Sequence, residues 1–230
     1  MAIRKVAVIG HPILRQRARK LTRDELLAEP MQRLIDDLIE TMRDANGAGL
    51  AAIQVYEPVH VCALEVNANP RYPYLPSVPL TVLVNAELTP LTTETFTNYE
   101  GCLSVPDLRG AVQRVASVRV RAWDRHGAPI DQEVSGLTAG TFQHELDHLD
   151  GTLFVDRVTD PRTLTTWKEY ERHHQREFVA QAEAVQAVAQ AVEIGRTLGL
   201  HLHDDAAGEV DAVVQSARKE QRQRAEQQHH

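Results

Sequence analysis

The sequence predicts an α+β fold with a helical C-terminal extension. Three observations lead to this prediction: one strongly amphipathic helical pattern, several short β-branched runs between turn residues, and a proline-free stretch rich in Ala, Gln and Glu after residue 163. The composition is that of a globular protein, because 43% of the 230 residues are hydrophobic and 25% are charged. The net charge of -7 argues against a general affinity for nucleic acid or anionic lipid.

The first half of the chain contains one helical pattern and two strand patterns. Apolar residues at helical spacing over 31–42 predict the first helix, with Pro30 near its start and Gly47 just past its end. The aliphatic runs 59–66 and 80–84 predict two strands, which a proline-rich loop separates. We therefore expect a helix followed by paired strands.

The second half repeats these signals and then changes character. The predicted elements are a hairpin over 112–123 and 130–134, a helix over 137–149, a short strand over 153–155 and a long helix over 163–192. Gly195 and Gly199 are expected to interrupt this last helix. The polar residues after 214 are expected to be frayed or disordered.

Cysteine content and the N-terminus indicate the cellular compartment. The two cysteines, Cys62 and Cys102, are too few for a disulfide framework, and a chain of this length does not need one. The apolar run after Lys5 is too short for a signal peptide, and no stretch approaches the roughly 20 apolar residues of a membrane span. We therefore expect a cytoplasmic protein with reduced thiols and no membrane partner.

The sharpest motif is the sequence QHELDH at residues 143–148. On a helix, His144 and His148 lie one turn apart on one face, so that both imidazoles can bind one metal ion. The adjacent Glu145 can then reach a water molecule on that metal and act as a general base. A catalytic metal of this kind needs a third protein ligand, either an acidic residue after His148 or one of the cysteines.

Two further segments are candidates for the same site. Cys102 lies between a glycine and a polar segment in YEGCLSVP, whereas Cys62 lies in an apolar run typical of a buried strand. The segment GAGLAAIQ, residues 47–54, has glycines that permit close approach of another chain and ends in the amide of Gln54. Helix termination and tight packing explain the same glycines equally well.

Together, GAGLAAIQ, EGCLS and QHELDH resemble the three signature motifs of peptide deformylases, which remove the N-formyl group from newly made polypeptides. The segment HPILR at 11–15 belongs to the same resemblance, which covers residues 1–175. It implies a catalytic domain over 1–177, with antiparallel β-sheets around a central metal-binding helix. Residues 178–230 would form a helical, partly disordered C-terminal extension.

The resemblance also implies a metal site and a mechanism. Cys102, His144 and His148 would bind one divalent metal, which is usually Fe(II) in this family, and Zn, Ni or Co also suit these ligand types. A metal-bound hydroxide would attack the formyl carbon and release formate. Glu145 would act as general base and then as general acid toward the leaving amine.

The remaining implied site residues concern the substrate. The amide of Gln54 and the backbone N–H of Leu103 would stabilise the charge that develops on the formyl oxygen. The backbone at Gly49 would run beside the extended peptide. The apolar pocket for the methionine side chain would be formed by Ala48, Leu137 and Thr141. Because Gly140 and Thr141 are small, we expect a roomier pocket and a relaxed preference for methionine.

The expected partner is the N-formylmethionyl end of a nascent chain, with no specific nucleic acid. The C-terminal extension is a candidate contact with the ribosome, although a charged helix packing on the catalytic domain or on a second copy explains it equally well. Two alternative functions remain: a zinc metalloprotease with the same helix motif, and a non-catalytic formyl-peptide binder or metal-stabilised domain. A purely structural site would not require Glu145 and Gln54, which favours the enzyme.

Overall fold

The computed structural model describes residues 2–67 and 74–197. In chain order the elements are η1 (Pro12–Arg15), α1 (Arg23–Leu27), α2 (Glu29–Asp44), β1 (Gly49–Ala51), η2 (Ala52–Val55), β2 (Val61–Val66), β3 (Val78–Pro90), β4 (Thr95–Cys102), β5 (Val105–Val115), β6 (Ser117–Trp123), β7 (Pro129–Ser135), α3 (Gly136–Leu149), α4 (Phe154–Arg157), η3 (Pro161–Thr163), β8 (Thr165–Thr166), α5 (Trp167–His173) and α6 (Gln175–Thr197). Within the described ranges, no helix is both long and apolar enough to cross a membrane.

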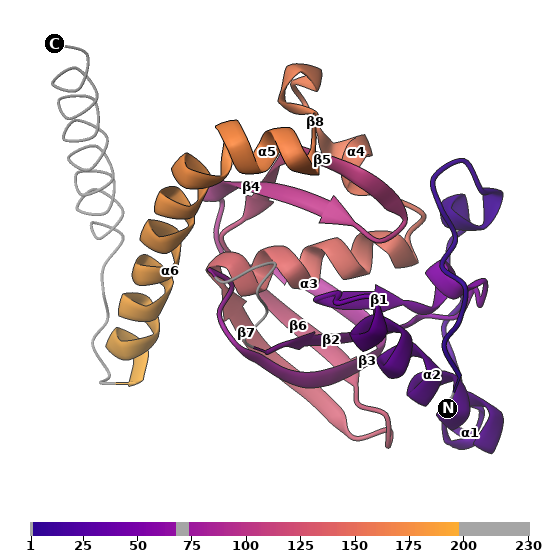
Figure 1. The fold of residues 1–230 in the computed structure, drawn as a ribbon. Helices are drawn as coiled ribbons and strands as arrows, with labels where there is room; N and C mark the ends of the chain where they lie inside the picture. The colour runs from indigo at the N-terminus through magenta and orange to yellow at the C-terminus, as the bar shows by residue number, and fades with distance from the viewer. Residues whose placement is uncertain (1, 68–73, 198–230) are drawn as a thin grey trace, which may run out of the picture. The chain divides into compact units, whose positions relative to one another are not determined.

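Two antiparallel sheets lie on either side of helix α3 (Figure 1). The larger sheet has the strand order β1-β2-β3-β6-β7, and the smaller sheet has the order β4-β5-β8. Each neighbouring pair of strands in both sheets is antiparallel. The structure therefore confirms the predicted α+β class and the central helix.

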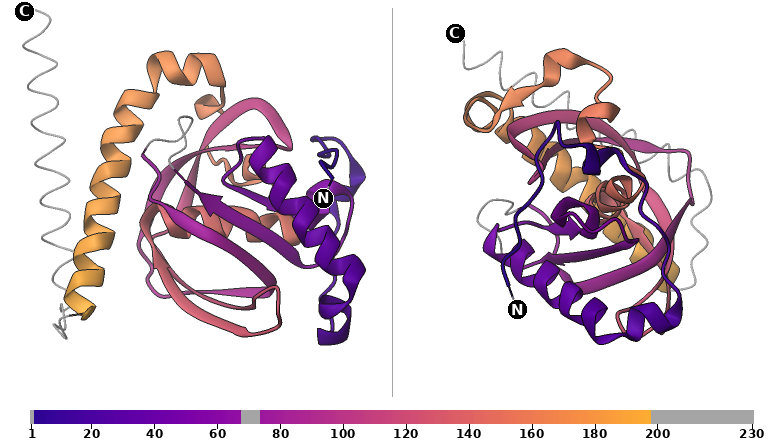
Figure 2. Two further views of the ribbon diagram at one scale, coloured as in Figure 1. Left: turned by 60° about the horizontal axis from the view of Figure 1, so that its bottom comes forward. Right: turned by 90° about the vertical axis from the view of Figure 1, so that its right-hand side faces the viewer.

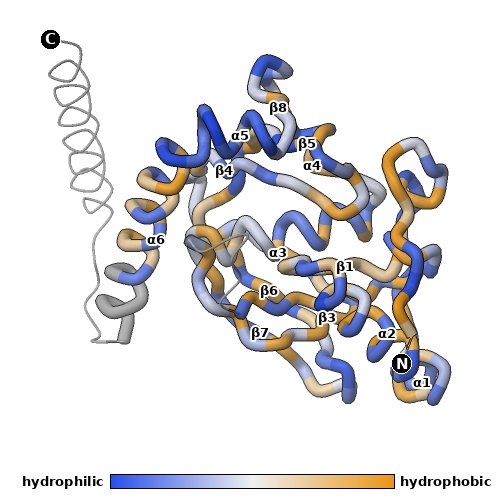
Figure 3. The backbone as a smooth tube through the Cα atoms, in the orientation of Figure 1, coloured by the Kyte–Doolittle hydropathy of each residue, from blue (hydrophilic) through white to orange (hydrophobic). Residues whose placement is uncertain are grey.

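The larger sheet separates two apolar clusters because side chains alternate along each strand. On β2, Cys62 and Leu64 pack in the cluster that contains the α3 residue Phe142. The alternate residues Val61 and Ala63 pack in the cluster that contains α2. Helix α2 accordingly crosses the larger sheet on the face away from α3 (Figure 2). The hydrophobic segments gather in the strands around α3, whereas α5 is mainly hydrophilic (Figure 3).

The predicted first helix and the predicted strands are confirmed with shifted ends. Helix α2 begins at Glu29 and ends at Asp44, and its apolar stripe is buried against the larger sheet. Each fully buried aliphatic side chain of that stripe contributes about 1.5–3 kcal/mol. Strands β2 and β3 match the runs 59–66 and 80–84, and the predicted hairpin is β6 with β7.

Two expectations for the last third of the chain are wrong. Residues 153–155 do not form a strand, because the carboxylate of Asp156 accepts the backbone N–H of Leu153 at 2.7 Å and caps the short helix α4. The segment 163–192 is not one helix. Its start pairs with β5 as strand β8, and Thr166 then caps α5 by accepting the backbone N–H of Glu169.

Helix α6 follows after a break and continues through Gly195, which was expected to interrupt it. The chain divides into two compact units, Met1–Ala182 and Glu183–His230. Everything described below lies in the first unit. The expected disorder after residue 214 and the ribosome contact fall mainly on residues 198–230, which lie outside the described residues.

Candidate active site

Three side chains that the motifs predicted as metal ligands converge between α3 and the smaller sheet. Cys102 is the last residue of β4, and His144 and His148 lie one turn apart on α3. Their ligand atoms all lie within 4.8 Å of one another. The Cys102 Sγ is 3.3 Å from Nε2 of His148, and the two imidazole rings are 4.9 Å apart between centroids. The structure thus brings the predicted triad together.

A buried ionic network orients one of these imidazoles. The Nδ1 of His144 lies 2.8 Å from the carboxylate of Glu100, which directs the other ring nitrogen, Nε2, toward the triad. Arg114 donates two hydrogen bonds to Glu100, at 2.6 and 2.8 Å, and both side chains are almost fully buried. Burial would raise the pKa of Glu100, but the hydrogen bonds from Arg114 and His144 lower it to about 2.

The network continues to the opposite side of Arg114. Its Nη1 donates to the carboxylate of Asp147 at 2.7 Å, and Arg157 also pairs with Asp147. Sequence reasoning missed Glu100, Arg114 and Asp147. A signal for Glu100 was present: it lies two residues before Cys102 on the same strand, so both side chains lie on the same face. No comparable signal pointed to Arg114, which comes from the neighbouring strand β5.

Glu145 points into the cleft and lies directly against the Gly49 backbone. The residue is 4% exposed, and no group within residues 2–67 and 74–197 hydrogen-bonds to its Oε2. Burial raises the pKa of Glu145 to about 7. A Cβ atom on Gly49 would lie only 2.4 Å from Oε1 of Glu145, so any larger residue here would displace the Glu145 carboxylate. Such a carboxylate can hold a proton near neutral pH.

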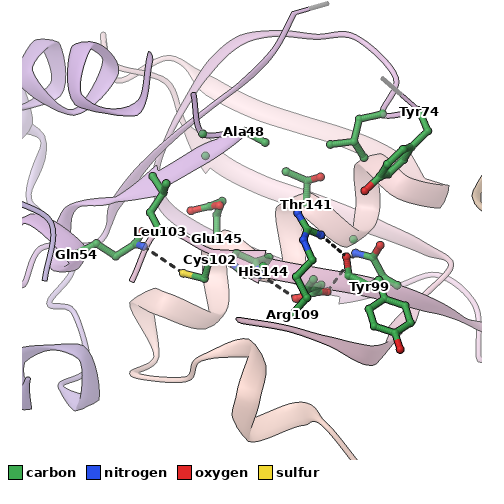
Figure 4. Close-up of a pocket in the computed structure, with 17 residues that line it drawn as sticks. Ala48, Gln54, Tyr74, Tyr99, Cys102, Leu103, Arg109, Thr141, His144 and Glu145 are labelled. Carbon is green, nitrogen blue, oxygen red and sulfur yellow. Dashed lines mark hydrogen bonds and ion pairs between the residues drawn. The ribbon is translucent and has the colours of Figure 1, made fainter. Parts of the chain in front are cut away.

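Gln54 reaches the same point from the opposite side (Figure 4). Its Oε1 accepts the backbone N–H of Ala51 at 2.8 Å, which fixes the direction of the amide group. Its Nε2 then donates to Oγ of Ser104 at 3.0 Å and faces the Sγ of Cys102 at 3.6 Å. The backbone N–H of Ser104 also donates to that sulfur, at 3.3 Å, and Leu103 lines the cleft between them.

Five of these residues line one cleft with a cavity volume of about 90 Å³: Gln54, Cys102, Leu103, His144 and Glu145. The predicted substrate residues Ala48, Gly49 and Thr141 also line it. Leu137 is not among the lining residues; it is 1% exposed, and its carbonyl accepts the Thr141 hydroxyl at 3.2 Å. The lining also includes residues that sequence reasoning did not place in the pocket, among them Tyr74, Asn98, Tyr99 and Arg109.

The room expected at Gly140 is taken up by neighbouring side chains. A Cβ atom on Gly140 would lie 3.2 Å from Nδ2 of Asn98 and 3.2 Å from Cζ of Phe96. Both neighbours come from β4, which crosses this part of α3. The amide of Asn98 and the ring edge of Phe96 therefore fill the space that a side chain at position 140 would occupy. This exchange could not be predicted from the sequence, because it depends on how β4 packs on α3.

The donor set fits one divalent metal ion. One sulfur and two imidazole nitrogens face a common point, while the cleft leaves a further position open to substrate or water. Imidazole ligands bind a metal in their neutral form, and burial lowers the pKa of His148 well below its ordinary value. Among the described residues, these three are the group of acidic, Cys and His side chains placed to hold a metal.

Comparisons with known proteins agree with this geometry. The family model described as polypeptide deformylase matches residues 3–164. Peptide deformylase 1 of Nitrosomonas europaea is 43% identical over 160 residues, which cover 70% of this chain and 90% of the relative. A peptide deformylase of Leptospira biflexa is 42% identical and covers 69% of this chain.

The similarity extends to solved structures. The class I type b peptide deformylase of Acinetobacter baumannii, determined with Met-Ala-Ser bound, superposes with a TM-score of 0.66 at 38% identity and covers 68% of this chain and 99% of its own. The enzyme of Thermotoga maritima gives a TM-score of 0.61 at 30% identity. In both comparisons the matched part is about the length of the family model.

Proposed function

The chain belongs to the polypeptide deformylase family, and on that premise we propose how its own residues carry out the reaction. The chain is a metal-dependent hydrolase that removes the N-formyl group from nascent peptides. One observation carries the assignment of roles: the ligand atoms of Cys102, His144 and His148 lie within 4.8 Å of one another in the cleft that Glu145 and Gln54 line.

Cys102, His144 and His148 hold the metal, and the metal is Fe(II). One thiolate and two imidazoles suit Fe(II), although Zn, Ni and Co suit the same donors, and Fe(II) is the usual ion in this family. When bound, the metal supplies a Lewis acid and an activated water molecule. Glu100 keeps His144 in the orientation and tautomer that a ligand needs, since it accepts the Nδ1 hydrogen at 2.8 Å.

Glu145 moves the proton of the reaction. Its carboxylate, with a pKa raised to about 7 by burial, accepts a proton from the attacking water and delivers it to the departing peptide amine. The carboxylate reaches the cleft directly, since Glu145 lines it beside Gly49 and Cys102. The products are formate and a free N-terminal amine, and the proton taken from the water ends on that amine.

Gln54 and Leu103 stabilise the formyl oxygen as negative charge develops on it. The Nε2 of Gln54 is aimed at the triad, and the N–H of Leu103 follows Cys102 directly in the chain. Donors of this kind each contribute about 2.7–4 kcal/mol in the transition state. The strand at Gly49 aligns the extended peptide, and the first side chain is received by Ala48, Thr141 and, behind them, Leu137.

The substrate and setting follow from this chemistry. The enzyme acts in the cytoplasm on N-formylmethionyl ends of nascent chains, and residues 1–177 are sufficient for catalysis. The family match over 3–164 supports this boundary, since all the side chains named for catalysis lie within it. The extension 178–230 is a candidate contact with the ribosome.

The test is formate release from formyl-Met-Ala-Ser by the full chain, prepared anaerobically with Fe(II). We expect rapid release by the parent protein. A parent that retains its metal and releases no formate would contradict the function. In parallel, Cys102→Ala should lose the metal, whereas Cys62→Ala, the matched control at a buried cysteine outside the cleft, should keep it. Full metal content in Cys102→Ala would contradict the ligand assignment.

A further inference from the structure

The outer end of the cleft is backed by residues that follow the catalytic motifs. The family model ends at residue 164, whereas Trp167 and Tyr170 lie on α5 and Phe178 lies on α6. Tyr170 is completely buried, and Phe178 is 3% exposed. These rings are therefore packed parts of the first compact unit, although they lie outside the matched region.

Tyr99 lines the cleft, and its ring packs against this segment on the face of β4 opposite to Asn98 and Glu100. Its centroid lies 5.2 Å from that of Tyr170, 5.7 Å from that of the stacked His174 and 5.9 Å from that of Phe178. Aromatic pairs at such distances attract one another beyond the apolar area that they bury. Tyr99 therefore takes its position from α5 and α6.

A second lining residue is held in the same way. The guanidinium carbon of Arg109 lies 3.9 Å from the ring centroid of Trp167 and 4.9 Å from that of Tyr170. Its Nη1 donates to the carbonyl oxygen of Tyr99 at 3.1 Å, which links the two lining residues. A third lining residue, Tyr74, packs edge-on against Phe178 at 5.3 Å.

Tyr74 and Tyr99 stand at the end of the cleft away from the reacting atoms, and Arg109 lies between that end and His144. In Figure 4, Tyr74 and Tyr99 lie opposite Gln54, and Thr141 lies between the two ends. Thr141 precedes His144 by three residues, about 4.5 Å along the helix axis. A side chain that starts beside the triad and passes Thr141 is therefore directed toward this backed end.

We propose that Tyr170 and Phe178 are positioning residues that set the depth of the pocket for the first side chain of the peptide. They act through the ring of Tyr74 and through Arg109, which line the cleft, without touching the formyl group. The inference rests on the proposed function and deepens it: the segment beyond the catalytic motifs selects how large the first residue can be.

The test is a competition between formyl-Met-Ala-Ser and formyl-Phe-Ala-Ser in one reaction of the metal-loaded full chain. The ratio of the two kcat/KM values does not depend on how much of the enzyme is folded or loaded with metal. Phe178→Ala removes the ring behind Tyr74 and Tyr99, and should shift the ratio toward the phenylalanine peptide by about tenfold, the order by which a pocket discriminates a small change in size. Phe178→Leu, which keeps an apolar side chain, should shift it less in the same direction.

Two matched variants separate positioning from general loosening. Tyr170→Leu removes the ring that packs on Arg109 and should shift the ratio. Ile35→Val, a buried change in α2 on the other face of the larger sheet, should lower stability and leave the ratio unchanged. An unchanged ratio in Phe178→Ala and Phe178→Leu, or an equal shift in Ile35→Val, would overturn the inference. A parent that releases formate from neither peptide would instead overturn the proposed function.

Discussion

The two ends of the cleft are held in place by different kinds of interaction. At the reacting end, charged groups fix one another: Arg114 joins Glu100 to Asp147, and Glu100 orients His144. At the outer end, packing of the Tyr99 ring on Tyr170 and Phe178 holds the lining residues in place. An ionic network tolerates little change, because each removed partner leaves a buried charge. A ring cluster can be altered in small steps, so the outer end can change selectivity while the chemistry is kept.

The largest effect is expected at the reacting end, for Glu145→Gln. The amide keeps the shape of the side chain beside Gly49 and cannot exchange protons, so the rate of formate release should fall by about 10²–10⁴-fold. Metal content should stay at the parental level, as measured on the same preparation. Activity within tenfold of the parent would show that another group moves the proton.

The next effect concerns the stability of the ionic network. Arg114→Met leaves Glu100 and Asp147 buried without their shared partner, and should lower the free energy of unfolding by about 3–5 kcal/mol in urea titrations. The matched control is Arg119→Met, which breaks the exposed pair with Asp131 and should cost less than about 1 kcal/mol. Equal losses of unfolding free energy in the two variants would mean that burial does not make the Arg114 network more costly to break than an exposed ion pair.

A smaller loss of stability is expected at Gly49, where the backbone lies against the carboxylate of Glu145. Gly49→Ala places a methyl group 2.4 Å from Glu145 and should destabilise the fold by about 1–3 kcal/mol while reducing formate release. Gly101→Ala serves as the steric control for the unfolding measurement, since its Cβ would meet Arg109 at an ordinary 3.4 Å. Parental stability and activity in Gly49→Ala would contradict the close approach.

The smallest effect is expected at the outer end. In Gly140→Ala the new methyl group presses on Asn98 and Phe96, each 3.2 Å away, and these side chains must shift by a few tenths of an ångström. We expect kcat for formyl-Met-Ala-Ser to stay within about threefold of the parent while the preference between methionine and phenylalanine peptides changes by less than about tenfold. A large fall in kcat with unchanged preference would place Gly140 at the reacting end instead.

The reacting end could be predicted from the sequence because its side chains follow local periodicities. His144 and His148 are separated by one helical turn, and Cys102 lies in a short motif. Glu100 obeys the two-residue period of a strand and could have been found by the same reasoning. Arg114 could not, because the register of β5 against β4 decides that it faces Glu100.

The outer end could not be predicted, for the same physical reason. Tyr170 and Phe178 approach Tyr99 only because the chain pairs with β5 as β8 and then breaks between α5 and α6. The sequence pattern over 163–192 has the composition of one long helix, which hides that break. Tertiary packing, rather than helix propensity, determines where these rings lie.

The most direct test of this division is a crystal structure of the metal-loaded protein with Met-Ala-Ser bound. We expect a metal ion on Cys102, His144 and His148, and a methionine side chain that runs past Thr141 and ends against Tyr74. A metal with a different ligand set, or a methionine side chain that leaves the cleft before it reaches Tyr74, would contradict these roles.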